Sequence, residues 1–307
     1  MNYLFLAILL PFVNVDCSNK THSEDTTQTI NANASTIKEI AEDDNILQRT
    51  YYIKEDSAKV VELLNKDING NDVLYYARTF KGVPYVAATL EKFDPERLVV
   101  NLRELDCTTL VETTLALTLT KRQGKTTFAD YCRNLMSLRY WQGDMSGYLS
   151  RLHYFTWWMH DNVDKGLVEI VNDEKHFTSV INVQNHYMSK HPDKYKFLNE
   201  KQSRIDSIVT LEKKYNGIDG HYLPESKTQL CKQQLKSIHD GDIIAIVTRK
   251  DGIDYSHLGF AVWGKDNRLH LLNASSIHHK VVEEPKTLYQ YLKEHPSSIG
   301  IRVLRLK

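Results

Sequence analysis

The sequence lacks an excess of charge of either sign, because 39 Lys and Arg residues balance 39 Asp and Glu residues. Binding to nucleic acid or to an anionic membrane calls for a basic surplus, so neither is expected as the main partner. The sequence also contains no G-x-S-x-G serine motif, no HExxH zinc motif and no Gly-rich loop that could cradle a phosphate. These absences disfavour serine-hydrolase, zinc-protease and nucleotide-dependent chemistry, and no cofactor is expected.

Cysteine is scarce, with four in 307 residues, at positions 17, 107, 132 and 231. If Cys17 belongs to a targeting segment, an odd number remains, and at least one thiol of an exported protein would stay free. Histidine is more frequent, but His153 and His160 lack the i, i+4 spacing of a helical metal site, and His278 and His279 are adjacent. No metal site is therefore expected.

The sequence also has no apolar run long enough to span a membrane. Its apolar segment Tyr3–Val13 is shorter and has the length of a signal-peptide core. Cys17 follows it closely, as in a bacterial lipoprotein, although Asp16 stands where a small residue is expected. A cleaved secretory signal and a lipid anchor at Cys17 both remain open, and a buried N-terminal strand is a weaker alternative. We expect an exported, periplasmic protein, with residues 1–17 as the signal and the polar residues 18–45 as a linker.

The remaining residues, 46–307, should form the folded domain, since the chain has 41% hydrophobic and 25% charged residues, as globular proteins do. Apolar residues at helical spacing come first, and short apolar runs between turn signals come last. The pattern predicts helices within residues 46–65, 72–79, 107–122, 128–138, 155–163, 206–215 and 287–293, and strands at 241–248, 257–263, 269–275, 281–282 and 299–304. Helices followed by an antiparallel meander indicate an α+β fold, with a helical insert at about 125–239.

The stretch Leu105-Asp106-Cys107-Thr108-Thr109-Leu110-Val111-Glu112 places a cysteine where an extended segment turns into an amphipathic helix. At a helix N-terminus, free backbone N–H groups and the helix dipole favour a thiolate. Cys107 is therefore a candidate nucleophile. The alternative is a buried structural cysteine, which is the expected role of Cys132.

Two further segments could contribute to a site. A glycine and a proline just before Tyr85 break a helix and would hold this side chain beyond a rigid turn, either in a site or at the edge of the core. The segment 139–154 mixes aromatic residues, arginines and glycines, and could line a sugar-sized cleft in which Arg139 or Arg151 binds a carboxylate. Alternatively, these arginines pair internally with Asp144 or with glutamates.

His257 opens the second predicted strand, and Asn273 lies late on the third. Antiparallel neighbours joined by a turn bring the start of one strand near the end of the next, so the imidazole and the amide could lie side by side. If the Cys107 helix packs on that sheet, Cys107, His257 and Asn273 converge as nucleophile, base and orienting group of a thiol site.

The ordered motifs of this chain resemble the NlpC-type branch of papain-like cell-wall peptidases and amidases. The matching segments are Gly82-Val83-Pro84-Tyr85, Asp106-Cys107-Thr108-Thr109-Leu110-Val111, Gly241-Asp242-Ile243, Ser256-His257-Leu258-Gly259 and Asn273-Ala274-Ser275-Ser276. The helical insert and the stretch Gly147–His153 resemble one subfamily more closely, the one called domain of unknown function 1460. The resemblance covers residues 46–307, and its specificity comes from the ordered set. The family often has histidine in the third catalytic position, where Asn273 departs from it, but an amide can also orient an imidazole.

The resemblance implies a papain-like N-acetylmuramoyl-L-alanine amidase that acts on peptidoglycan fragments, with a preference for 1,6-anhydro-muropeptides. It implies that the Cys107 thiolate attacks the amide carbonyl and that His257 activates the thiol and protonates the leaving amine, while Asn273 fixes the ring. The backbone N–H of Cys107 and the Tyr85 hydroxyl would hold the oxyanion. A monomer is expected. The expected substrate contacts are Asp106, Tyr148, Arg151 and Ser256.

Three other functions stay open. A γ-D-glutamyl-diamino-acid endopeptidase would keep this site and cleave another bond of the muropeptide. A non-catalytic cell-wall-binding lipoprotein would keep only the fold, although a pure binder has no need of Cys107, His257 and Asn273 together. A thiol transglutaminase or acyltransferase would use the same dyad and transfer the acyl group to an amine.

Overall fold

A computed structural model describes residues 41–307, so the predicted signal and most of the predicted linker lie outside the described residues. Residues 41–44 are helical, and a separate compact unit runs from Asn45 to Lys307. Within the described range, no helix combines the length and the apolar character that crossing a bilayer requires.

Most predicted helices of the first half are confirmed, with small shifts at their ends. They are α2 (Lys54–Leu64), α3 (Asp72–Thr79), α4 (Cys107–Arg122), α5 (Phe128–Arg139) and α6 (Phe155–Asp164), followed by α7 (Tyr187–Lys190) and α8 (Gln202–Tyr215). The first prediction, a helix within 46–65, is only partly right. Thr50–Tyr51 forms strand β1, which pairs in parallel with β2 (Leu98–Val99), so α2 begins after it.

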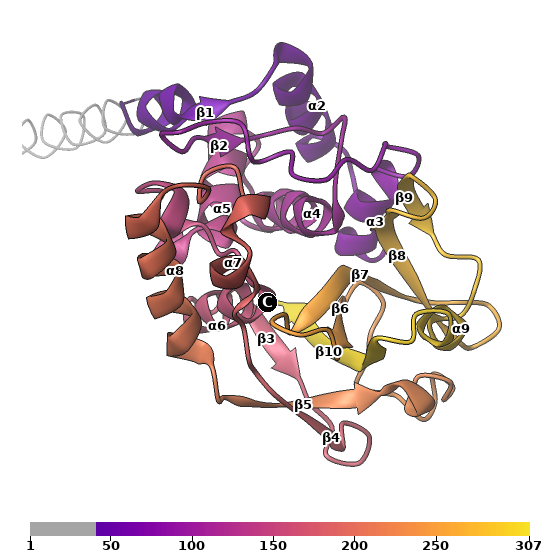
Figure 1. Cartoon of the computed structure of the whole chain (residues 1–307). Helices are drawn as coiled ribbons and strands as arrows, with labels where there is room; N and C mark the ends of the chain where they lie inside the picture. Colours follow the sequence, from indigo (N-terminus) through magenta and orange to yellow (C-terminus); the bar gives the residue numbers. More distant parts are fainter. Residues whose placement is uncertain (1–40) are drawn as a thin grey trace, which may run out of the picture. The chain divides into compact units, whose positions relative to one another are not determined.

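Helix α4 lies among the other helices and packs against the sheet (Figure 1). Its N-terminus is capped by Asp106, whose carboxylate accepts the Thr109 backbone N–H at 2.8 Å while the Thr109 hydroxyl accepts the Asp106 N–H at 2.9 Å. This reciprocal capping box fixes where the helix begins. The predicted amphipathic character is wrong, because every residue from Thr109 to Thr120 is buried. The central helix therefore holds Cys107 on a rigid, fully packed element.

The predicted antiparallel meander is confirmed, and the fold is α+β. It consists of β6 (Ile243–Thr248), β7 (Tyr255–Trp263), β8 (Leu269–Ser275) and β9 (Lys280–Glu283), and β10 (Ser298–Leu306) returns to pair with the other edge of β6. The complete sheet has eight strands in the order β4-β5-β10-β6-β7-β8-β9, with β3 also paired to β10. All pairs in this sheet are antiparallel.

The insert at about 125–239 is not purely helical, which corrects the prediction. It supplies three strands, β3 (Val168–Val171), β4 (Ser179–Asn182) and β5 (Asp219–Pro224). Each of them is short, and β4 alternates between half-buried and exposed residues, so its apolar signal is weak. They form strands because β10, with nine residues, offers β3 and β5 a long edge, and β4 then pairs with β5.

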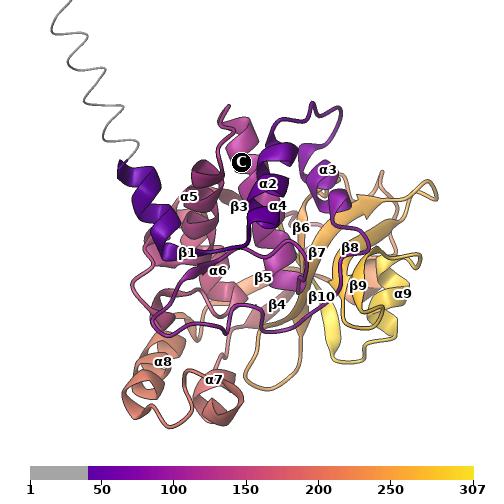
Figure 2. The same cartoon turned by 90° about the horizontal axis from the view of Figure 1, so that it is seen from above.

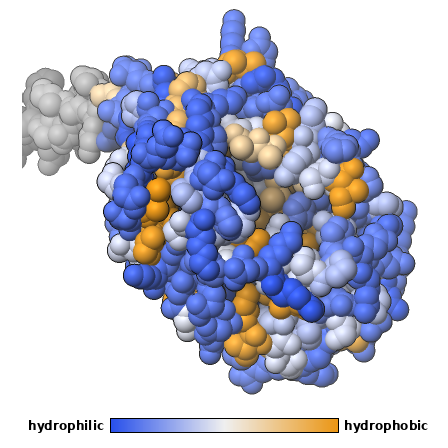
Figure 3. All heavy atoms as spheres, in the orientation of Figure 1, coloured by the Kyte–Doolittle hydropathy of each residue, from blue (hydrophilic) through white to orange (hydrophobic). Residues whose placement is uncertain are grey.

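The central strand β6 is buried on both faces of the sheet. Ile243, Ala245 and Val247 of β6 pack in the core shared with α4, whereas Ile244 and Ile246 pack in a second core with α9 (Leu288–Lys293). Figure 2 shows α9 on the side of the sheet away from α4. Burial on both faces explains why β6 is an uninterrupted apolar run. The surface seen in Figure 3 is mostly hydrophilic, with apolar residues in small, scattered patches.

Candidate active site

Cys107 is the first residue of α4 and lies in a cleft of about 220 Å³. The same cleft contains His257 and Ser256, which come from β7. Two elements far apart in sequence thus bring together the predicted nucleophile and the predicted base. The full lining consists of Cys107, Thr108, His153, Tyr154, Phe155, Met188, Tyr195, Ile253, Asp254, Tyr255, Ser256, His257 and Leu258.

The predicted rigid turn places Tyr85 next to Cys107. On one side the Leu105 N–H donates to the Pro84 carbonyl at 3.0 Å, and on the other the Tyr85 N–H donates to the His279 carbonyl at 3.0 Å. The turn is therefore tied both to the segment that precedes α4 and to the β8–β9 connection. Burial raises the pKa of Tyr85, and the neighbouring Cys107 and Asp106 raise it further. The phenol is protonated at neutral pH and can donate a hydrogen bond.

The imidazole of His257 is oriented by a buried polar chain. Its Nε2 lies 2.9 Å from Oδ1 of Asn273, and Nδ2 of Asn273 donates to Oε1 of Glu284 at 3.0 Å. Because a carboxylate only accepts, Glu284 fixes which end of the amide faces it, and Oδ1 is left to accept the Nε2–H of His257. The proton on Nε2 leaves the Nδ1 lone pair of His257 as the basic site. Glu284 is buried and was not predicted from the sequence.

Gly259 allows β7 and β8 to approach closely enough for this chain. A Cβ atom at position 259 would lie 2.6 Å from the Leu272 carbonyl oxygen and 3.1 Å from the Cβ of Asn273. Both contacts involve atoms that cannot swing away, so a side chain here would push β8, and Asn273 with it, away from His257. Gly259 is therefore needed to keep Asn273 within hydrogen-bonding distance of His257.

The thiol and the imidazole are both neutral in the free protein at pH 7. Burial raises the pKa of Cys107 to about 12, with a contribution from Asp106, and outweighs the donors from the Leu258 backbone and Thr108. Burial also lowers the pKa of His257, partly offset by Asn273, Glu284 and Asp106. The resting thiolate expected at a helix N-terminus is thus disfavoured by desolvation.

Glu284→Gln should lower kcat about tenfold and move the acid limb of the kcat/KM profile to lower pH. The uncharged amide weakens a hydrogen bond that involves a charged group, which is worth about 1.5–3 kcal/mol. It also removes a charge that raises the pKa of His257, so the imidazole stays neutral, and able to act as a base, to a lower pH. The control is Glu283→Gln, because Glu283 instead pairs with Arg78 at 3.0 Å near the surface. An unchanged acid limb in Glu284→Gln would contradict this account.

Arg151 and Tyr148, two of the expected substrate contacts, do not line the cleft. Arg151 is 6% exposed, and its guanidinium bonds Glu91 at 2.6 Å and Glu96 at 2.9 and 3.0 Å. Arg139 is likewise paired with Glu112 at 2.7 Å. The structure thus favours the alternative that the arginines of segment 139–154 pair internally. Asp106 remains beside Cys107, with one carboxylate oxygen used as the helix cap.

His153 lines the cleft together with Tyr154, at the end of the segment 139–154 that was expected to line one; as a single residue His153 was weighed as a metal ligand. Its Nε2 lies 2.8 Å from the Tyr148 carbonyl, which can only accept, so this nitrogen carries the proton. Burial, assisted by the nearby Arg151, lowers the pKa of His153 to about 3. Tyr148 and Arg151 therefore keep His153 in place and uncharged, and no local sequence signal announces this arrangement.

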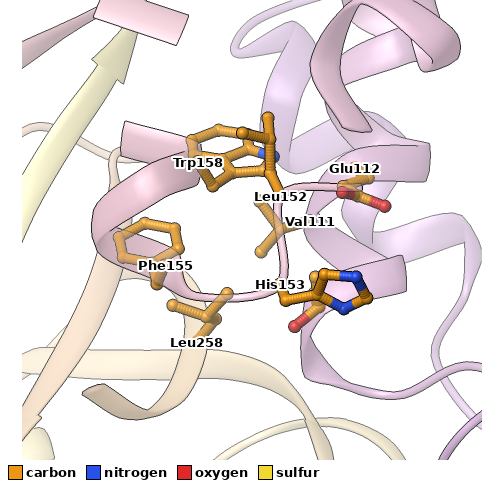
Figure 4. A pocket seen from close by; sticks show the side chains of 8 residues that line it. Val111, Glu112, Leu152, His153, Phe155, Trp158 and Leu258 are labelled. Carbon is orange, nitrogen blue, oxygen red and sulfur yellow. The ribbon is translucent and has the colours of Figure 1, made fainter. Parts of the chain in front are cut away.

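A second, smaller space adjoins the cleft, and we call it the recess. It has a volume of about 30 Å³ and is lined by Thr108, Val111, Glu112, Leu152, His153, Phe155, Trp158 and Leu258. Figure 4 shows the aromatic rings of Phe155 and Trp158 and the aliphatic side chains of Val111, Leu152 and Leu258 gathered around it. Four of its residues, Thr108, His153, Phe155 and Leu258, also line the cleft.

Among residues 41–307, no three His, Cys, Asp or Glu side chains gather closely enough to hold a metal ion. The cleft contains a thiol and an imidazole, and the amide of Asn273 is bonded to that imidazole. This set suits nucleophilic attack on an acyl carbon followed by proton transfer to a leaving group.

The chain is similar to proteins of known structure over most of its length. A family model described as N-acetylmuramoyl-L-alanine amidase-like matches residues 75–301. The crystal structure of an N-acetylmuramoyl-L-alanine amidase from Bacteroides uniformis ATCC 8492 has a TM-score of 0.73 and 41% identity, over 78% of this chain and 100% of that one. A Bacteroides fragilis structure, named provisionally as a xylanase, has a TM-score of 0.71 and 41% identity, over 76% of this chain and 100% of that one.

A more distant structure shows the same fold. It is a Legionella pneumophila protein assigned to domain of unknown function 1460, with a TM-score of 0.60 and 23% identity, over 82% of this chain and 95% of that one. No curated protein matches the chain.

Proposed function

This chain belongs to the N-acetylmuramoyl-L-alanine amidase-like family, and we propose that it is a cysteine hydrolase that cleaves the amide between N-acetylmuramic acid and L-alanine in peptidoglycan fragments. The observation that carries the proposal is the shared cleft of Cys107 and His257, with Asn273 bonded to the imidazole at 2.9 Å. In this proposal the site is papain-like, and the preferred substrate is the 1,6-anhydro form. The protein is exported by its N-terminal signal and acts in the periplasm.

The protonation states suggest how the first step proceeds. When substrate binds, the Cys107 thiol gives its proton to Nδ1 of His257 while the sulfur attacks the carbonyl carbon of the lactyl group. The oxyanion accepts hydrogen bonds from the backbone N–H of Cys107 and from the Tyr85 hydroxyl. A donor of this kind typically contributes about 3 kcal/mol to transition-state stabilisation.

The second half of the reaction returns the site to its starting state. The imidazolium of His257 protonates the alanine nitrogen, the C–N bond breaks and a thioester remains on Cys107. His257 then takes a proton from water, the hydroxide attacks the thioester and the thiolate is reprotonated. The products are a muramic acid carboxylate and a peptide with a free N-terminal alanine.

Glycoside hydrolysis, which the name of the Bacteroides fragilis structure suggests for that protein, fits this cleft poorly. That reaction generally needs two carboxyl groups on either side of the glycosidic bond. Asp254, the carboxyl residue of the cleft lining, is buried and accepts hydrogen bonds from Thr156 and Asn185. Near Cys107, the Asp106 carboxylate caps α4 and the Glu112 carboxylate is paired with Arg139. A thiol with a positioned base is instead suited to acyl transfer.

The test is digestion of purified anhydro-muropeptide followed by mass spectrometry of the products. The proposal expects a free stem tripeptide and an intact anhydro-sugar with a free lactyl carboxylate. A dipeptide left on the sugar would identify a γ-D-glutamyl-diamino-acid endopeptidase. Transfer to an added amine in preference to water would identify an acyltransferase, and binding without turnover of any muropeptide would identify a non-catalytic binder.

A further inference from the structure

We propose that the recess binds a methyl group attached to a carbon next to the scissile amide, and so limits the substrate to residues of alanine size. This inference rests on the proposed function, because it assigns a specificity subsite to the same reaction. It concerns the recess, which lies beside the reacting groups and has no part in the mechanism proposed above.

The position of the recess supports this role. Thr108 directly follows Cys107 and Leu258 directly follows His257, and both line the recess as well as the cleft. The Leu258 backbone N–H also donates toward the Cys107 sulfur. The recess therefore begins within one residue of both reacting side chains. A substrate group that enters it has to be attached close to the scissile bond.

The size of the recess supports a single small group. Its volume of about 30 Å³ is much smaller than the cleft's volume of about 220 Å³, so the recess accommodates only a small group. Val111 and Trp158 are 1% and 2% exposed and belong to the main core, so they cannot move aside cheaply. A group larger than the recess would have to displace these packed side chains, which overpacks the site.

The chemistry of the wall favours an apolar guest. Val111, Leu152, Phe155 and Trp158 contribute apolar side chains to the wall. Two polar members are already engaged, because Glu112 accepts a hydrogen bond from Arg139 at 2.7 Å and His153 is bonded to the Tyr148 carbonyl at 2.8 Å, whereas the buried indole Nε1 of Trp158 has no hydrogen-bond partner among the described residues. A methyl group can enter without leaving either of these groups unpaired.

The proposed substrate offers two methyl groups of this kind. The lactyl carbon on the acyl side of the scissile amide carries one, and the alanyl carbon on the amine side carries the other. The recess can hold one of them, and substrates altered on one side at a time tell which. On the amine side the series is glycyl, alanyl and 2-aminobutyryl; on the acyl side it is glycolyl, lactyl and 2-hydroxybutyryl.

With the unaltered protein, the expected result is a peak in kcat/KM at the methyl-bearing member of one series. An added methylene should lower kcat/KM at least about tenfold, and a missing methyl should lower it as well. The other series should change little. Equal kcat/KM across both series would overturn the proposal.

Two variants of one residue test the recess directly. Val111→Ala enlarges it and should move the preference toward the 2-aminobutyryl or 2-hydroxybutyryl substrate, whereas Val111→Ile fills it and should move the preference toward the glycyl or glycolyl substrate. The matched control is Val60→Ala, because Val60 is a buried valine of α2 in the same core that does not line the recess. Identical substrate ratios in all three variants would contradict the assignment.

Calorimetric binding of both series to Cys107→Ala separates this inference from the proposed function. If the unaltered protein hydrolyses no substrate but binding to Cys107→Ala still peaks at the methyl-bearing member, the recess assignment stands and the proposed function falls. If the amide is hydrolysed but neither binding nor kcat/KM responds to methyl size, the proposed function stands and the recess assignment falls. If neither the binding constants nor kcat/KM depend on the size of the alkyl group, the recess assignment falls, whether or not the protein cleaves the amide.

Discussion

Cys107→Ala should lower the hydrolysis rate constant for muropeptide by about 10⁶-fold while leaving muropeptide binding measurable. Removing a nucleophile that works as a unit with its base has a cost of this order in hydrolases that form acyl-enzymes. Binding should survive because the remaining twelve residues of the cleft lining are unchanged. The measurements are product formation by mass spectrometry and binding by calorimetry on the same preparation.

Cys132→Ala is the matched control for this result. Cys132 is also a free cysteine, but it is buried in α5 and does not line the cleft. It should keep full activity and lose only the stability associated with a smaller core side chain, about 1 kcal/mol. If Cys107→Ala kept its hydrolytic activity, another nucleophile would have to be sought. If it lost binding together with its thermal transition, the activity loss would report damage to the fold.

The part of the site that lies on β7 and β8 could be predicted because its signals are local. The dipeptides Asp251-Gly252 and Asp266-Asn267 favour turns between the strands, and the structure has turns there, with φ of 77° at Gly252 and 59° at Asn267. These turns set the order and direction of the strands, and that places His257 beside Asn273. Helix α4 was placed correctly for a similar reason, since its cap and its last basic residues are adjacent to the apolar run.

Other parts of the site depend on partners that are distant in sequence. Arg151 is paired with carboxylates 55 and 60 residues before it, and no periodicity distinguishes such an arginine from one that binds substrate. Glu284 contacts Asn273 from beyond the end of β9, 11 residues away, so its role appears only when the sheet is assembled. The strands of the insert were missed because each depends on a neighbour already in the sheet rather than on its own pattern.

The ion pair of Arg139 and Glu112 offers the prediction with the largest expected effect on stability. Their side chains are 2% and 3% exposed, the Nε–Oε2 distance is 2.7 Å, and Arg139 also donates to the Val99 carbonyl at 2.8 Å. Arg139→Met should lower the free energy of unfolding by about 3–5 kcal/mol, because Glu112 would remain buried without a counter-charge. In a domain of this size the thermal transition should fall on the order of 10 °C.

The pH dependence of this deficit distinguishes loss of the charge pair from loss of packing. Burial already raises the pKa of Glu112, against the opposing effect of Arg139, so Arg139→Met should raise it further. A carboxyl group with a raised pKa in the folded state costs stability above that pKa, so the deficit should shrink as the pH falls. Restoring neutrality with Glu112→Gln in the Arg139→Met background should recover part of the loss.

Arg78→Met is the control. Arg78 pairs with Glu283, but its side chain is 46% exposed, so the substitution should lower the free energy of unfolding by less than about 1 kcal/mol. A deficit that stayed constant with pH and was unchanged by Glu112→Gln would mean that Arg139 stabilises α4 through its aliphatic packing alone.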